Sequence, residues 1–118
     1  MIGRLAASLA AGVVAAGLLA ACGGGSAAPA APVATSQVDL PRSYEFRPAV
    51  ITVTAGTTVK WTNHDNFTHT VRLTDNGTHE LGTMSPGQSL THTFNTPGTY
   101  HYDCSLHPQD MHGEVIVT

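Results

Sequence analysis

The feature that most constrains the fold is a series of short β-type segments, separated by turns that contain Gly or Pro, between residues 37 and 118. Val59 and Trp61 alternate with polar neighbours, which is the period of a half-buried strand. No window in this region keeps the 3.6-residue period of an amphipathic helix. Closely spaced strands without helices predict an all-β sandwich or barrel, with about six to eight strands.

Several of these segments have clear boundaries. Asp75-Asn76-Gly77 is a strong turn signal, and the Pro-Gly pairs at residues 86–87 and 97–98 mark two more turns. In the last segment before the final strand, Tyr100, Tyr102 and Cys104 share one face because side chains alternate along a strand. The ranges that we expect to form strands are 50–53, 57–63, 70–74, the run that holds Leu90, His92 and Phe94, 99–104 and 114–118.

Length and charge exclude several classes of protein. A chain of 118 residues predicts one domain. Its net charge of −3 provides no basic field to bind nucleic acid. Two cysteines do not make a disulfide framework. The unusual count is that of histidine, because all seven follow residue 60.

The N-terminal residues predict an export signal. Arg4 precedes an uncharged, Ala-rich run over residues 5–21, shorter than the roughly 20 residues of a membrane span. The sequence Leu19-Ala-Ala-Cys22 resembles the lipobox of bacterial lipoproteins. That resemblance implies cleavage before Cys22 and lipidation of its thiol. Two or three acyl chains on one residue anchor a protein stably to a membrane.

The chain therefore divides into three parts. We expect residues 1–21 to be a lipoprotein signal peptide, and residues 22–36 to be the lipidated cysteine with a Gly-, Ala- and Pro-rich flexible linker. Residues 37–118 are the folded domain. We expect an exported protein that is lipid-anchored at the cell membrane and faces the periplasm or the extracellular side. Cys104 is then the one unmodified thiol in an oxidising compartment, and metal binding is one reason to keep it.

Side chains with sulfur and nitrogen atoms that can bind a metal are concentrated in the last loop. Cys104, His107 and Met111 lie close together between the last two expected strands, and His69 lies at the start of an earlier one. They supply a thiolate, two imidazoles and a weak thioether donor. Two His and one Cys in a plane, with a long axial Met, form the ligand set of blue-copper sites. The sequence therefore predicts one such copper ion.

Ordered motifs across about 75 residues resemble the cupredoxins, most closely the amicyanin, plastocyanin and halocyanin branch. The resemblance implies a Greek-key β-sandwich that holds one type 1 copper ion and carries single electrons without substrate turnover, so the protein is not expected to be an enzyme. The motifs are Tyr44–Pro48, Ile51–Gly56 and Val59–Asn63 for the N-terminal strands, Thr68–Val71 for the first ligand, and Gly98–His107 with Met111–Val115 for the copper loop.

Two departures leave the axial ligand open. Three residues separate His107 from Met111, whereas amicyanin-like loops hold two and plastocyanin-like loops four, and Leu106 replaces a proline. Met111 is the favoured axial donor, with His112 or Gln109 as alternatives.

The resemblance also assigns a supporting role beside the copper ligands. Asn63 resembles the family residue whose side chain ties the first-ligand loop to the cysteine loop, so we expect it to support the site.

The leading hypothesis is a membrane-anchored electron carrier. The family transfers electrons through the loop histidine, here His107, so we expect transient redox partners to dock there, against Leu106 and Pro108. We expect a monomer. The alternative is an extracytoplasmic copper-binding or trafficking lipoprotein, which the surplus histidines favour, and a further alternative is an accessory domain that binds copper only for stability.

Overall fold

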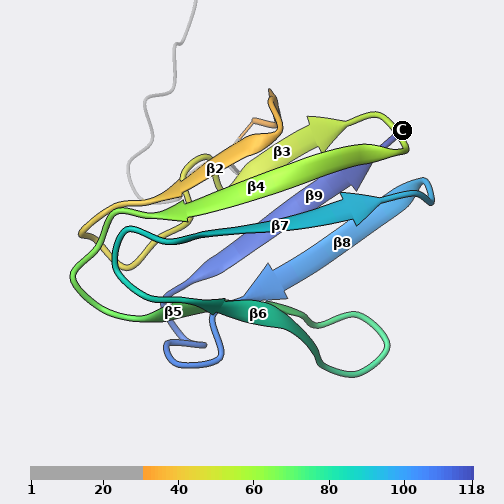
Figure 1. Cartoon of the computed structure of the whole chain (residues 1–118). Helices are drawn as coiled ribbons and strands as arrows, with labels where there is room; N and C mark the ends of the chain where they lie inside the picture. Colours follow the sequence, from red (N-terminus) through yellow and green to blue (C-terminus); the bar gives the residue numbers. More distant parts are fainter. Residues whose placement is uncertain (1–30) are drawn as a thin grey trace, which may run out of the picture.

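The computed structural model describes residues 31–118, and this part of the chain consists of strands and connecting loops without a helix (Figure 1). The described residues accordingly contain no helix long and apolar enough to cross a membrane. The signal peptide expected at residues 1–21 and the lipidation expected at Cys22 lie outside the described residues.

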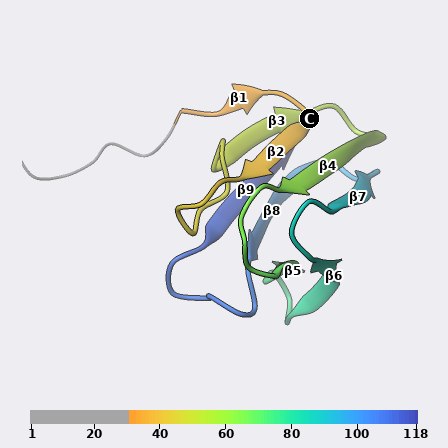
Figure 2. The same cartoon turned by 60° about the vertical axis from the view of Figure 1, so that its left-hand side comes forward.

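The nine strands of residues 31–118 form two sheets that face each other as layers (Figures 1 and 2). The six-stranded sheet has the order β1 (Val33–Ala34), β3 (Val50–Val53), β9 (His112–Val117), β8 (Gly98–Asp103), β5 (His69–Leu73) and β6 (His79–Met84). The three-stranded sheet has the order β2 (Gln37–Leu40), β4 (Thr57–Asn63) and β7 (Ser89–Phe94).

The core lies between the two sheets and is built from alternate residues of each strand. In β4, Val59 and Trp61 are fully buried, and Trp61 packs against Tyr102 of β8. The ring centroids of Trp61 and Tyr102 are 5.5 Å apart in an edge-to-face arrangement, which aromatic pairs prefer. This packing fixes the position of β8, the strand that leads directly into Cys104.

The connections β4–β5 and β8–β9 lie at the same end of the sandwich (Figures 1 and 2). The strand pairing explains this, since β8 runs antiparallel to both β5 and β9. Asp103, the last residue of β8, pairs with Arg72 of β5, so the residues that follow β8 lie beside the start of β5. As a result, two segments that are far apart in the sequence, residues 63–69 and 104–111, lie beside each other.

The expected all-β sandwich is confirmed, and the nine strands in the described part of the chain exceed the expected six to eight. The additional strands include β1, which lies inside the 22–36 segment interpreted as a linker, where Val33 pairs with Ile51. They also include β6, whose residues Glu80 and Gly82 are not typical of strands. Pairing with β5 stabilises β6, with a register shift between Val71 and Arg72.

Candidate metal centre

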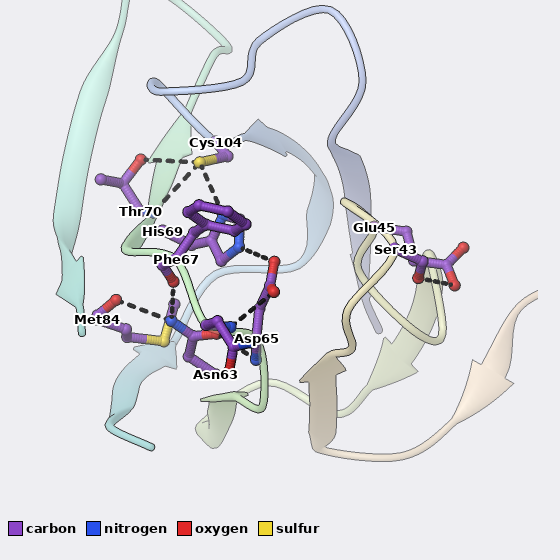
Figure 3. Close-up of polar contacts among 10 residues, drawn as sticks. Ser43, Glu45, Asn63, Asp65, Phe67, His69, Thr70, Met84 and Cys104 are labelled. Atoms are coloured by element: carbon purple, nitrogen blue, oxygen red, sulfur yellow. Dashed lines mark hydrogen bonds and ion pairs between the residues drawn. The ribbon is translucent and has the colours of Figure 1, made fainter. Parts of the chain in front are cut away.

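His69, the first residue of β5, is fully buried, and its ring has a defined orientation. Its Nε2 lies 2.8 Å from Oδ2 of Asp65 (Figure 3). Because an ionised carboxylate can only accept, Nε2 carries a proton, and Nδ1 is the ring nitrogen that is free to bind a metal. Nδ1 faces Cys104, with 3.8 Å between Nδ1 and Sγ. The hydrogen bond with His69 also holds the pKa of the Asp65 carboxyl below its usual value, although burial opposes this effect.

Cys104 follows β8 directly and is a fully buried free thiol. Its loop is closed by main-chain hydrogen bonds. The amide of Cys104 donates to the carbonyl of Met111 over 3.2 Å, and the carbonyl of Cys104 accepts from the amide of His107 over 3.1 Å. The amide of Met111 donates in turn to the carbonyl of His107 over 3.1 Å. These bonds make a compact turn that brings the three predicted ligands of this loop together.

His107 lies next to the other predicted imidazole. The ring centroids of His107 and His69 are 5.4 Å apart. Tyr44, from the β2–β3 connection, packs edge-on against both rings, at 4.8 Å from His107 and 6.1 Å from His69. His107 is half-buried, whereas His69 is not exposed at all. The His107 ring is therefore the part of the donor cluster that is nearest to solvent.

The three candidates for the axial position differ in burial. Met111 has no exposed surface. His112 and Gln109 are both exposed, and His112 is already the first residue of β9, where it pairs with Asp103. Burial therefore favours Met111 for a donor directed toward Cys104.

Within residues 31–118, no three His, Cys, Asp or Glu side chains converge closely enough to define a metal site by geometry alone. The candidate site instead depends on the chemistry of its donors, which are the thiol of Cys104, the imidazoles of His69 and His107, and the thioether of Met111. A set of two nitrogen and two sulfur donors, with the thiol and one imidazole already in contact, fits a soft transition metal such as copper.

Asn63 supports the site in a different way from the one expected. Its Nδ2 donates to the carbonyls of Phe67 and Met84 over 2.8 and 3.0 Å, and its Oδ1 accepts from the amide of Asp65 over 2.9 Å (Figure 3). These bonds shape the loop that leads to His69. Among the described residues, none of the hydrogen bonds of Asn63 reaches the Cys104 loop.

The two loops are joined by Thr70 instead. Its Oγ1 accepts from the amide of Ser105 over 2.8 Å and lies 2.7 Å from Ser105 Oγ. Its own amide donates to Cys104 Sγ over 3.4 Å. Sequence reasoning missed Thr70 and also Asp65. The only sequence feature that could have indicated them is their position near His69: Thr70 directly follows it, and Asp65 precedes it by four residues.

Exposed apolar side chains surround the His107 end of the molecule. Phe67 and Leu106 are each 54% exposed, and Tyr44 is 38% exposed. The rings of Tyr44 and Phe67 stack with centroids 5.9 Å apart. Leu106 was predicted for this surface, whereas Tyr44 and Phe67 come from two other loops.

Comparison with known proteins is consistent with this geometry. The family model for a cupredoxin-like domain matches residues 12–117. The chain is 35% identical over 83 residues to a chloroplastic plastocyanin of Tetradesmus obliquus, a match that covers 61% of this chain and 57% of the plastocyanin. It is 34% identical over 91 residues to amicyanin-alpha of Methylorubrum extorquens, covering 74% of this chain and 75% of the relative. Among solved structures, the Cu(I) form of an amicyanin mutant is similar with a TM-score of 0.65 and 28% identity, covering 76% of this chain and 86% of that one.

Proposed function

The chain belongs to the cupredoxin-like family, and from this membership we propose that it is a blue copper protein that carries single electrons between redox partners. The observation that carries the proposal is the buried contact between Nδ1 of His69 and Sγ of Cys104, next to the ring of His107. The similarity to plastocyanin and to the Cu(I) form of an amicyanin mutant supports the same assignment.

His69, Cys104 and His107 are the proposed main ligands, and Met111 is the proposed axial one. When bound, copper would supply a one-electron couple between Cu(I) and Cu(II). Asp65 keeps the Nε2 proton of His69 in place, so that Nδ1 remains available as a donor. The main-chain bonds of residues 104–111 hold the other three donors in one turn.

Burial of the donors favours an electron carrier over a copper-trafficking protein. His69, Cys104 and Met111 have no exposed surface, and only His107 is partly exposed. Delivery of copper to a partner requires ligands that can be exchanged at the surface. A donor set enclosed by the core instead excludes water and keeps its arrangement when the charge of the site changes.

The apolar surface around His107 is the proposed docking site for redox partners. Tyr44, Phe67 and Leu106 are exposed there, and His107 is the donor nearest to solvent. Transient redox complexes use small interfaces, which permit fast release after the electron has moved. The protein is proposed to act as a monomer.

Its location is proposed from the sequence alone. The Leu19–Cys22 motif supports export and a lipid anchor at Cys22, which would place the domain at the outer side of the cell membrane.

The proposal is tested by redox cycling of the copper-loaded full-length chain in detergent, in the presence of a moderate excess of a Cu(I) chelator. An electron carrier takes up one electron per protein and keeps its copper through repeated reduction and oxidation. Transfer of copper to the chelator on the first reduction would support the trafficking alternative and contradict the proposal.

A further inference from the structure

A series of polar contacts leads from the protein surface to the sulfur of Cys104. Glu80, an exposed residue of β6, accepts from the hydroxyl of Ser105, with 2.5 Å between Oε1 and Oγ. Ser105 Oγ lies 2.7 Å from Oγ1 of the buried Thr70. Thr70 Oγ1 in turn lies 3.7 Å from Cys104 Sγ, and Figure 3 shows this last contact beside the one between Cys104 and His69.

The number of available protons fixes the direction of this chain. Each hydroxyl has one proton to donate, and an ionised carboxylate can only accept. The proton of Ser105 is therefore donated to Glu80, so that Ser105 Oγ must accept in its contact with Thr70. The single hydroxyl proton of Thr70 then points toward Ser105, over the shorter distance, and away from Cys104 Sγ.

Two neighbouring groups do not alter this result. The amide of Ser105 donates to Thr70 Oγ1 and uses only a lone pair of that oxygen. Arg72, the cation nearby, donates to both carboxylate oxygens of Asp103, over 2.8 and 2.7 Å. Among residues 31–118, Ser105 is accordingly the only side chain that hydrogen-bonds Glu80.

We propose that Glu80 and Ser105 keep the hydroxyl proton of Thr70 away from the Cys104 sulfur, and that they thereby lower the reduction potential of the copper site. This inference rests on the proposed function, in which Cys104 is a copper ligand. Hydrogen bonds to the cysteine sulfur tune the potential of such sites. A hydroxyl that donates to the sulfur withdraws electron density from the thiolate. This destabilises the oxidised state, because Cu(II) draws more electron density from the thiolate than Cu(I) does. The Thr70 amide donates to Sγ in either case, so only the hydrogen bond from the Thr70 hydroxyl can be gained or lost.

The first test is Ser105→Ala, which changes no charge and removes the acceptor for the Thr70 proton. Released from Ser105, the Thr70 hydroxyl donates to Cys104 Sγ. We expect the ratio of reduced to oxidised protein at a fixed ambient potential to rise about two- to tenfold, the effect of one hydrogen bond of ordinary net strength. The thiolate-to-copper absorption band should also move to shorter wavelength.

The matched background is Thr70→Val, which has a similar shape but no hydroxyl. In this background Ser105→Ala should change neither the ratio nor the band. A Ser105→Ala protein that binds copper without either change overturns the inference. The same shift with and without the Thr70 hydroxyl also overturns it, because the effect would then not pass through that proton.

Glu80 provides an independent test at an exposed position, where folding is least affected. Glu80→Ala and Glu80→Gln both remove the charge, but the glutamine carbonyl oxygen can still accept the Ser105 proton. We expect a higher reduced-to-oxidised ratio for Glu80→Ala than for Glu80→Gln, and we expect Thr70→Val to abolish the difference. This pair decides the question if Ser105→Ala does not fold.

Equal ratios for the two Glu80 variants overturn the inference and leave the proposed function intact. Wild-type protein without a thiolate-to-copper band overturns the proposed function and the inference together.

Discussion

Gly113 is the position at which a single added methyl group should cost the most stability. It pairs with Tyr102 across strands β8 and β9. A Cβ atom at Gly113 would lie 2.2 Å from Cζ of Tyr102 and 2.3 Å from its hydroxyl oxygen. Non-bonded carbons rest about 3.5–4.0 Å apart, so the Tyr102 ring would have to move by roughly 1.3 Å.

The ring has little room for this movement. Tyr102 is 1% exposed, and its ring centroid lies 4.7 Å from that of Phe46 and 5.5 Å from that of Trp61. Overpacking a core costs about 1–3 kcal/mol, and the depth of this overlap places Gly113→Ala near the upper limit. The lower entropy of the unfolded alanine chain offsets about 0.4–1 kcal/mol. We expect a net loss of about 2 kcal/mol, which lowers the melting temperature of a domain of this size by about 8–16 °C.

Gly82→Ala is the matched control, because it adds the same methyl group to a strand glycine of the same sheet. Its Cβ would lie 2.7 Å from Cδ1 of Leu90, the end of a flexible and partly exposed side chain. This contact can relax by rotation of Leu90, so we expect a stability within about 1 kcal/mol of wild type. The assay is thermal and urea unfolding of the copper-free proteins, followed by circular dichroism. Equal stability of the Gly113→Ala and Gly82→Ala proteins would refute the reasoning.

Three further predictions concern the axial donor, the anchor and acid stability. Met111→Leu should keep copper and colour but raise the reduction potential by roughly 40 mV, about 1 kcal/mol, because even a weak donor stabilises Cu(II) more than Cu(I). An unchanged potential in cyclic voltammetry would mean that Met111 only packs, and His112→Ala would then be measured. Cys22→Ala should move the protein from the membrane to the soluble fraction, or leave it unprocessed, without changing its spectrum; a processed, membrane-bound variant would contradict the lipid anchor. Hydrogen bonds from His101, first from its amide, lower the pKa of Asp75. The ionised Asp75 carboxylate therefore stabilises the fold above its unfolded pKa of about 3.9, and this stabilisation is lost as the pH falls through the lower folded pKa. Asp75→Asn should weaken the dependence of the unfolding free energy on acid pH. An identical pH profile for the variant and the wild type would be evidence against this role.

Strands with regular alternation could be predicted from the sequence, because their burial follows directly from side-chain period. Val59 and Trp61 are both fully buried, as their alternation indicates. Strand β6 could not be predicted in this way, because only Met84 among its residues is buried and its order comes from pairing with β5. The same holds for β1, whose two residues are exposed and pair with β3.

The donor residues could be proposed from the sequence because each is chemically distinctive, and Cys104, His107 and Met111 also share one short loop. Their supporting contacts could not be proposed. Asp65 and Thr70 are common residue types, and their roles depend on how two distant loops meet. Asn63 shows the same limit, because its position suggested support for the site but not the carbonyls to which it donates.

The central claim is that the thiolate of Cys104 binds a single copper ion that changes oxidation state. The most direct test is the visible absorption spectrum of the Cu(II)-loaded protein, compared with that of Cys104→Ser. We predict an intense thiolate-to-copper band in wild type that disappears on reduction and returns on oxidation. The band should be absent in Cys104→Ser, which should still fold, because a serine hydroxyl stays protonated at neutral pH and is a poor ligand for soft metals. A wild-type protein that binds Cu(II) without this band, or a band that persists in Cys104→Ser, would contradict the claim.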